Sequence, residues 1–285
     1  MDIGVFQITP DSKNDPAAVA QRAEALGFES YWAADHIITP VESTDCYPGT
    51  KPGDPQPAYL PYIPDPLMML ARVSGVTSTI KLGTAVCLVA ERSPLLLAKQ
   101  IATLDEASGG RFVFGVGGGW DRAECTILGG DFDHRWTQIR ESIAVMKGLW
   151  TVDGYAHHGR YYDFPAVRCF PRPARTPYPP ILLGSFPNAR TFKRIVDYAD
   201  GWLPIVFDPE ELRAHVDQIK RYADEKGRDH SEIDISVFGA MTQWRTRESV
   251  EALRKAGAKR VIVWLLASDT KGALEELEAL AKELL

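Results

Sequence analysis

Asp35 and His36 are an acid and an imidazole of the kind that move protons in enzymes, and they follow an apolar run that starts at Ser30. An imidazole exchanges protons near neutral pH, and a neighbouring carboxylate can orient it. A histidine at this position could equally cap a strand or bond to a backbone carbonyl, so both roles stay open. We predict catalytic roles for His36 and, as an orienting partner or a strand-end cap, for Asp35.

Small residues at three places could let the backbone approach a ligand. Gly117–Gly119 stand before Trp120, and because a tight turn needs only one glycine, three favour close approach to a flat ring or a phosphate. Gly184 and Ser185 precede a helical segment whose N-terminus could bind an anion, although a plain helix cap would also explain Ser185. Gly83–Ala85 stand inside an apolar strand, where a bulge, a close backbone contact or core packing would explain them.

The sequence lacks the motifs of several catalytic classes. It contains no HxH or HExxH motif, and the adjacent His157 and His158 cannot easily face one metal ion, so we expect no catalytic metal. No predicted strand ends in a lysine, which disfavours a Schiff-base aldolase, and no GxSxG motif is present. With few acids, bases or metal ligands available, we expect a cofactor to supply the chemistry.

Short apolar runs alternate with segments of helical periodicity along the chain, a pattern typical of parallel strand–helix units. The predicted strands are Ile3–Ile8, Ser30–His36, Leu82–Val89, Phe112–Gly117, Pro180–Phe186, Gly201–Val206, Ile235–Met241 and Arg260–Leu266. The predicted helices are Asp15–Leu26, Asp65–Thr77, Pro94–Ala107, His134–Trp150, Ala189–Tyr198, Pro209–Lys226, Arg247–Ala256 and a C-terminal helix to about Leu285.

These eight units predict an α/β fold in which residues 1–285 form a single (β/α)8 TIM barrel. Thr151–Pro179 would be an irregular insertion before strand five. An open, doubly wound sheet is the alternative, but such a sheet rarely needs eight consecutive units. The active site of a barrel lies at the carboxyl ends of its strands, so the chemistry is expected where the predicted strands two to five end.

Charge and cysteine usage narrow the class of protein. The net charge is −6 and no block of lysines or arginines occurs, which disfavours a general nucleic-acid binder. Four scattered cysteines without a CxxC pair fit reduced thiols in a cytosol. The N-terminus reads as a first strand, and no apolar run is long enough to span a bilayer, so we expect a soluble, cytoplasmic protein.

A series of short motifs runs in order through most of the chain. They are Ala34–His36, Leu82–Val86, Ser93–Leu95, Ala98-Lys99, Thr103–Asp105, Ser108–Arg111, Gly115–Trp120, Glu124, Arg135, Glu141, Leu149–Thr151, Pro179–Ile181 and Ala199–Trp202. Each is weak alone, but their ordered occurrence resembles the bacterial-luciferase-like flavin superfamily, and specifically its branch that uses the deazaflavin coenzyme F420.

The resemblance implies that a tricyclic ring lies in the mouth of the barrel. Asp35 and His36 would lie against the ring, and a bulge with a non-prolyl cis peptide near Gly83–Ala85 would support one face. The glycine loop and Gly184-Ser185 would contact the ribityl-phosphate chain. The implied cofactor-binding residues are Asp35, His36, Gly83, Thr84, Ala85, Gly117, Gly118, Gly119, Trp120, Gly184 and Ser185.

One position departs from some relatives. Those that oxidise sugar phosphates carry a carboxylate directly after the strand-four glycines, whereas this chain has Trp120. A sugar-phosphate dehydrogenase is therefore disfavoured. The role of Glu124 stays open, and we expect Arg111 to be structural.

The resulting functional prediction is an oxidoreductase, expected to be a homodimer, that transfers a hydride between coenzyme F420 and a small organic substrate. The first alternative is an FMN-dependent luciferase-like monooxygenase on the same barrel. Oxygen chemistry distinguishes the two, because a deazaflavin has carbon in place of the flavin N5 and does not activate O2 usefully. The second alternative is a non-catalytic barrel that binds a flavin or another small ligand.

Overall fold

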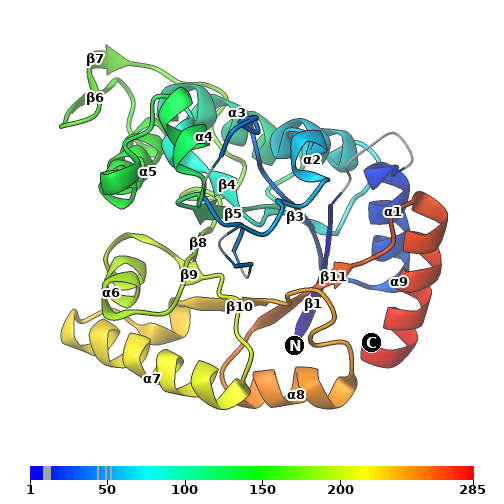
Figure 1. The fold of residues 1–285 in the computed structure, drawn as a ribbon. Coiled ribbons are helices and arrows are strands. Elements are labelled where there is room, and N and C mark those ends of the chain that lie inside the picture. Colours follow the sequence, from blue (N-terminus) through cyan, green and yellow to red (C-terminus); the bar gives the residue numbers. More distant parts are fainter. Residues whose placement is uncertain (9–13, 44, 49, 52) are drawn as a thin grey trace.

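The computed structural model describes residues 1–8, 14–43, 45–48, 50–51 and 53–285. Eight parallel strands close into a barrel in the order β3-β2-β1-β11-β10-β9-β8-β5, and β5 pairs back with β3 (Figure 1). Helices pack around the outside of this barrel. The predicted (β/α)8 barrel is therefore confirmed. Parts of the predicted segment between strand two and its helix, at Thr44, Gly49 and Pro52, lie outside the described residues.

The barrel strands are β1 (Asp2–Gln7), β2 (Ser30–Ala33), β3 (Lys81–Thr84), β5 (Phe112–Gly117), β8 (Ile181–Gly184), β9 (Gly201–Trp202), β10 (Asp234–Phe238) and β11 (Arg260–Leu265). The helices are α1 (Pro16–Leu26), α2 (Pro66–Ser74), α3 (Pro94–Ala107), α4 (Arg122–Ile127), α5 (Arg135–Thr151), α6 (Ala189–Tyr198), α7 (Pro209–Glu225), α8 (Arg247–Lys255) and α9 (Thr270–Leu284).

Strands two and three differ from the sequence-based prediction. Strand two ends at Ala33 and not at His36, since its last ladder bond is the one that Ala33 O accepts from Ala85 N, at 2.8 Å. The strand predicted for Leu82–Val89 is divided into β3 and β4 (Cys87–Leu88) by a cis peptide between Ala85 and Val86. Asp35 and His36 consequently lie beyond the ladder, at the mouth of the barrel.

The segment before strand five is not irregular throughout, as predicted. It contains an antiparallel hairpin of β6 (Tyr155–His158) and β7 (Asp163–Val167), in which partly buried and exposed residues alternate along β6. The short helix α4 was not predicted from the sequence. Asp121 begins α4 by accepting hydrogen bonds from the backbone of Ala123 and Glu124, a capping signal that precedes too few residues to give helical periodicity.

Bulky apolar side chains fill the barrel interior, so it is a packed core and not a pore. They are Phe6, Trp32, Val113, Leu182, Leu203, Phe238 and Ile262. Gly83 belongs to this core, because a Cβ at residue 83 would overlap the indole of Trp32. Core packing thus accounts for this glycine.

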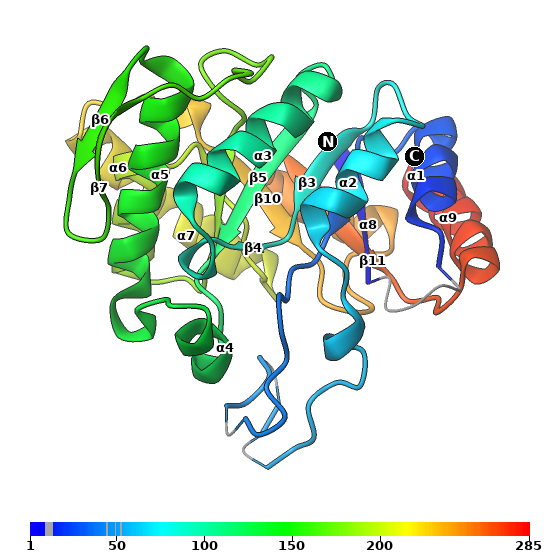
Figure 2. The same ribbon diagram turned by 90° about the horizontal axis from the view of Figure 1, so that it is seen from above.

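Two segments extend from the carboxyl end of the barrel. The long connection from β2 to α2 and the helix α4, which follows β5, project from the same side (Figure 2). Both come after strands whose ends carry predicted site residues. This end of the barrel is therefore the place where their side chains can meet.

Candidate active site

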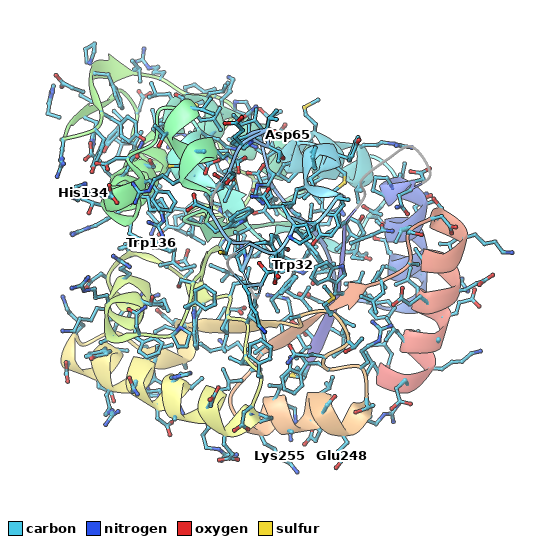
Figure 3. All side chains as sticks on the ribbon, in the orientation of Figure 1. Trp32, Asp65, His134, Trp136, Glu248 and Lys255 are labelled. Carbon is cyan, nitrogen blue, oxygen red and sulfur yellow. The ribbon has the colours of Figure 1, made fainter. Side chains whose placement is uncertain are left out.

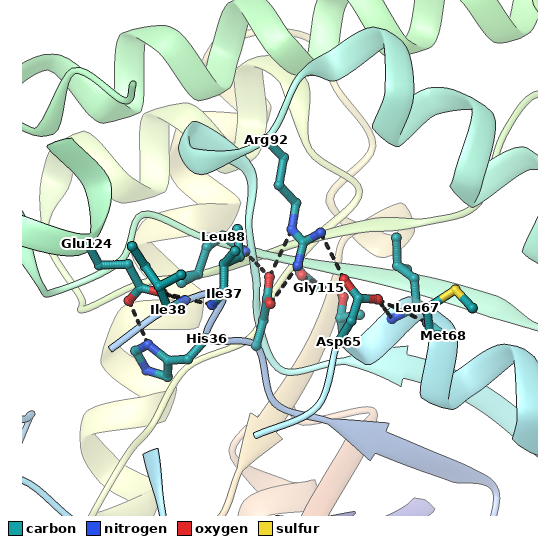
Figure 4. Close-up of polar contacts among 12 residues, drawn as sticks. His36, Ile37, Ile38, Asp65, Leu67, Met68, Leu88, Arg92, Gly115 and Glu124 are labelled. Atoms are coloured by element: carbon teal, nitrogen blue, oxygen red, sulfur yellow. Dashed lines mark hydrogen bonds and ion pairs between the residues drawn. The ribbon is translucent and has the colours of Figure 1, made fainter. Parts of the chain in front are cut away.

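His36 pairs with Glu124 at the mouth of the barrel (Figure 4). Nδ1 of His36 lies 2.7 Å from Oε2 of Glu124, which is 1% exposed. The other oxygen of Glu124 accepts hydrogen bonds from the backbone N–H groups of Ile37, at 2.8 Å, and Ile38, at 3.2 Å. A carboxylate at Nδ1 favours the tautomer with hydrogen on that nitrogen, which leaves Nε2 with the lone pair.

Trp120 lies against this lone pair. Its indole Nε1 donates a hydrogen bond of 3.3 Å to Nε2 of His36, and the two rings meet edge-on with centroids 5.6 Å apart. Tyr47, from the connection after β2, contacts the same indole edge-on at 5.5 Å. A substrate group that bonds to Nε2 of His36 would have to replace Trp120 at that nitrogen.

Asp35 forms a buried ion pair with Arg92. Its carboxylate accepts hydrogen bonds from Arg92 at 2.7 Å and 3.2 Å and from the backbone N–H of Leu88 at 2.9 Å. Arg92 also donates to Asp65, the N-cap of α2, at 3.1 Å. The pair joins the end of β2 to β4 and α2. The residue that orients His36 is therefore Glu124, whose role the sequence left open, while Arg92 occupies the carboxylate of Asp35.

Val86, which follows β3, packs against the ends of β5 and β8, and this role was not predicted from the sequence. A Cβ at Gly117 or at Gly184 would overlap the side chain of Val86. Beside it, the hydroxyl of buried Thr84 donates a 2.7 Å hydrogen bond to the carbonyl of Gly115. Gly117, at the end of β5, and Gly184, at the end of β8, therefore allow these two strands to lie close to Val86.

A second buried acid lies under the glycine loop. Glu91, in the short 3-10 helix η2 (Val89–Glu91), is 6% exposed, and its Oε2 has no hydrogen-bond partner within the described part of the chain. Gly119 has φ of +69°, and a Cβ there would lie 2.9 Å from Oε1 of Glu91. Burial and the nearby carboxylate of Glu124 raise the pKa of Glu91 to about 9. Glu91 is therefore a neutral carboxylic acid at pH 7.

A cavity of about 700 Å³ opens beside the starts of α5 and α6, where Figure 3 labels His134 and Trp136. Its lining residues are Asp133, His134, Trp136, Thr137, Asn188, Ala189, Arg190 and Arg194. Gly118 adjoins it, since a Cβ there would lie 3.1 Å from the Trp136 ring and 3.3 Å from Nε of Arg135. Nε of Arg135 and Oγ of Ser185 are buried without partners among the described residues. Cationic and donor groups beside a glycine loop fit a phosphate.

The structure brings most of the predicted residues to one end of the barrel. Contacts link His36 to Trp120, and Val86 links Gly117 to Gly184. Arg111 is structural, as expected, because it donates to backbone carbonyls of Ser74, Thr77, Ile80 and Ser108. Within the described ranges, no cluster of three His, Cys, Asp or Glu residues could hold a metal ion, and no helix is long and apolar enough to cross a membrane.

The barrel and its polar groups define an enzyme-like α/β barrel, and the comparisons assign it to a family. Residues 3–284 match the family model for luciferase-like monooxygenases. The chain therefore belongs to the luciferase-like monooxygenase family, a family of oxidoreductases. An uncharacterized protein of Mycobacterium tuberculosis is 37% identical over 204 residues, 71% of this chain and 72% of that protein.

A further relative and a protein of similar fold are named for different cofactors. The FMNH(2)-dependent dimethylsulfone monooxygenase of Pseudomonas putida is 32% identical over 165 residues, which cover 56% of this chain and 44% of that enzyme. The structure of coenzyme F420-dependent tetrahydromethanopterin reductase from Methanopyrus kandleri superposes with a TM-score of 0.75 at 19% identity, over 100% of this chain and 99% of that one. This structural likeness concerns the fold alone.

Proposed function

We propose that this protein is an oxidoreductase that transfers a hydride between coenzyme F420 and a small organic substrate. The observation that carries the proposal is the His36–Glu124 pair at the mouth of a luciferase-like barrel, with the glycine loop and a cationic cavity beside it. The choice of F420 over FMN rests on the sequence motifs that resemble the F420 branch. When bound, the deazaflavin would supply hydride transfer.

His36 handles the proton that accompanies the hydride. In the direction of alcohol oxidation, Nε2 of His36 accepts the hydroxyl proton, and the carboxylate of Glu124 stabilises the imidazolium that forms. In the reverse direction, the imidazolium returns that proton to the carbonyl oxygen. Trp120 packs edge-on against the imidazole and Tyr47 packs against Trp120, and together they restrict access of water to this proton. Asp35 acts indirectly, by fixing the chain before His36 through Arg92.

Cofactor choice can be tested by titrating the protein with coenzyme F420 and with FMN in parallel. We expect F420 to bind with a dissociation constant at least tenfold lower than that of FMN, a difference of about 1.4 kcal/mol. Quenching of cofactor fluorescence measures both. Equal affinities, or FMN retained at full occupancy through purification, would overturn the F420 proposal in favour of the FMN-dependent monooxygenase, which the relative from Pseudomonas putida supports.

The proton-transfer role can be tested with two substitutions, on the best substrate from a panel of alcohols and enones. His36→Ala should lower kcat about a hundredfold or more while cofactor affinity stays within a few-fold, since acid–base catalysis contributes ~10²–10⁴ in rate. Glu124→Gln should lower kcat by about tenfold or more, because a neutral amide no longer stabilises the imidazolium. His158→Ala, on the exposed face of β6, is the matched control and should leave kcat unchanged.

If His36→Ala loses cofactor affinity but keeps kcat at saturation, His36 only packs against the ring. If the protein binds F420 and no panel substrate reacts, the non-catalytic binding barrel becomes the better description. We further propose that residues 1–285 act as one domain and that two copies form a homodimer, whose mass light scattering would measure.

A further inference from the structure

The cavity beside α5 and α6 carries unpaired cations in a protein whose net charge is −6. Arg190 and Arg194 line it, and neither pairs with a carboxylate in the part of the chain that the structure describes. The acid in the lining, Asp133, is already held by Arg122 through hydrogen bonds of 2.7 Å and 3.0 Å. The cavity therefore has an uncompensated positive charge.

Both arginines stand where the helix by itself disfavours them. Arg190 lies in the first turn of α6, where the helix dipole repels cations. Arg194 follows four residues later on the same face, and like charges at this spacing destabilise a helix. Asn188 caps α6 by accepting the backbone N–H of Thr191 at 2.9 Å, so the helix does not need the arginines in order to begin. An anionic ligand in the cavity would offset both unfavourable interactions.

A third guanidinium, that of Arg135, lies next to the glycine loop. Nε of Arg135 is buried without a partner within the described ranges, next to Gly118. Arg194 lies over the ring of Trp136, with its guanidinium carbon 5.1 Å from the ring centroid, which limits the conformations of the arginine. Burial lowers the pKa of Arg194, and the charges of Arg190 and Arg135 act in the same direction. Arg194 therefore experiences the positive charge of both other arginines.

We propose that Arg190 and Arg194 bind carboxylates of the glutamyl tail of coenzyme F420, with Arg135 on the phosphate side next to Gly118. The inference rests on the proposed F420 function. FMN ends in a single phosphate, whereas F420 continues through a phosphodiester into a chain of glutamates. A cavity of about 700 Å³ that is lined by two guanidiniums, with the guanidinium of Arg135 next to the adjoining Gly118, has more room and more positive charge than one phosphate requires.

The test compares F420 with several glutamates, the glutamate-free form of the cofactor, and FMN. Each is titrated by fluorescence into the wild type and into the double variant Arg190→Gln, Arg194→Gln, at low and at high salt. Arg221→Gln, an exposed arginine on α7, is the control for loss of one charge. Circular dichroism of each variant verifies the fold.

In the wild type at low salt, the polyglutamylated form should bind at least tenfold more tightly than the glutamate-free form, and salt should reduce this difference. The double variant should lose the difference and keep its affinity for the glutamate-free form, whereas Arg221→Gln should retain the wild-type pattern. If all F420 forms bind the wild type equally, or if the double variant keeps the preference, the tail site is wrong although the F420 function stands. If no F420 form binds, the proposed function fails, and the tail site fails with it.

Discussion

The hydrogen bond between His36 and Glu124 joins residues that are 88 positions apart in the chain. The same carboxylate also accepts the backbone N–H groups of Ile37 and Ile38, so it fixes the chain after His36 as well as the ring. At the residue scale, one buried acid therefore sets both the tautomer and the position of the imidazole. Glu91, close by, differs because its Oε2 has no hydrogen-bond partner among the described residues and the charge of Arg92 does not outweigh its burial.

Glu91 should make the protein less stable as the pH rises. Its folded-state pKa is raised to about 9 from the ordinary value of 4.5, so its contribution is fully present below about pH 4.5 and is lost as the pH rises towards 9. Glu91→Gln removes this titration, and we expect the variant to gain stability relative to the wild type between pH 5 and pH 8, by at most about 1.4 kcal/mol per pH unit.

Urea unfolding of the wild type and of Glu91→Gln at pH 5 and pH 8 measures this change. Glu106→Gln, an exposed glutamate on α3, is the control and should show no pH-dependent gain. A difference between wild type and Glu91→Gln that is the same at both pH values would mean that Glu91 is ionised in the folded protein at pH 8.

At the scale of the elements, strand ends that are distant in sequence converge because three glycines leave room for neighbouring side chains. Gly117 and Gly184 accommodate Val86, and Gly119 accommodates Glu91. Gly118 differs from them, because the neighbours of its missing Cβ are Trp136 and Arg135, which adjoin the cavity. A change at Gly118 should therefore affect the ligand more than the packing of the barrel.

We expect Gly118→Ala to weaken cofactor binding by about tenfold, or about 1.4 kcal/mol, while the protein stays folded. The added Cβ would lie 3.1 Å from the Trp136 ring, so the indole, which lines the cavity, must shift slightly. Fluorescence titration with F420 measures the affinity, and thermal unfolding verifies the fold. Gly75→Ala is a suitable control, because its nearest neighbour would be at 3.7 Å. If the Gly118→Ala variant is folded and binds F420 with unchanged affinity, residue 118 does not take part in cofactor binding.

At the scale of the whole molecule, an ion network joins strands at the amino end of the barrel, opposite the candidate site. Arg260, at the start of β11, donates two hydrogen bonds of 2.8 Å to Glu29, which precedes β2. Lys81 of β3 donates to the same carboxylate at 2.6 Å, and Ser236 of β10 accepts from Arg260 at 2.7 Å. The buried pair of Arg260 and Glu29 thereby connects β11 and β10 to β3 and to the start of β2.

Glu29→Gln should destabilise the barrel in a pH-dependent way. Burial alone would raise the pKa of Glu29, but hydrogen bonds and the charge of Arg260 outweigh it and lower the pKa to about 2. The stabilisation is therefore present above about pH 4.5 and is lost as the pH falls towards 2. We expect a loss of about 1.5–3 kcal/mol at pH 7, the range for hydrogen bonds to charged groups, and a smaller one at pH 3. Unfolding in urea at both values measures it, and an equal loss at both would contradict the assigned pKa.

The sequence by itself determined the barrel, and it predicted the end of the barrel at which the candidate site lies. Apolar alternation and helical periodicity are local properties, so they predicted eight strand–helix units. Residues at or just after the strand ends, such as Asp35-His36 and Gly117–Gly119, could therefore be found directly. The hairpin β6–β7 and α4 escaped prediction because short elements hardly rise above loop composition.

Only the tertiary structure decided which side chains interact. Asp35 and Glu124 are both acids near the mouth, and the sequence predicted Asp35 as an orienting partner of His36 or a strand-end cap while the role of Glu124 stayed open. The folded chain instead pairs Asp35 with Arg92 and Glu124 with His36. The buried acid Glu91 and the arginines of α6, which have no carboxylate partner among the described residues, likewise follow from how elements pack. Burial and charge compensation depend on neighbours from distant units, and no local pattern encodes those neighbours.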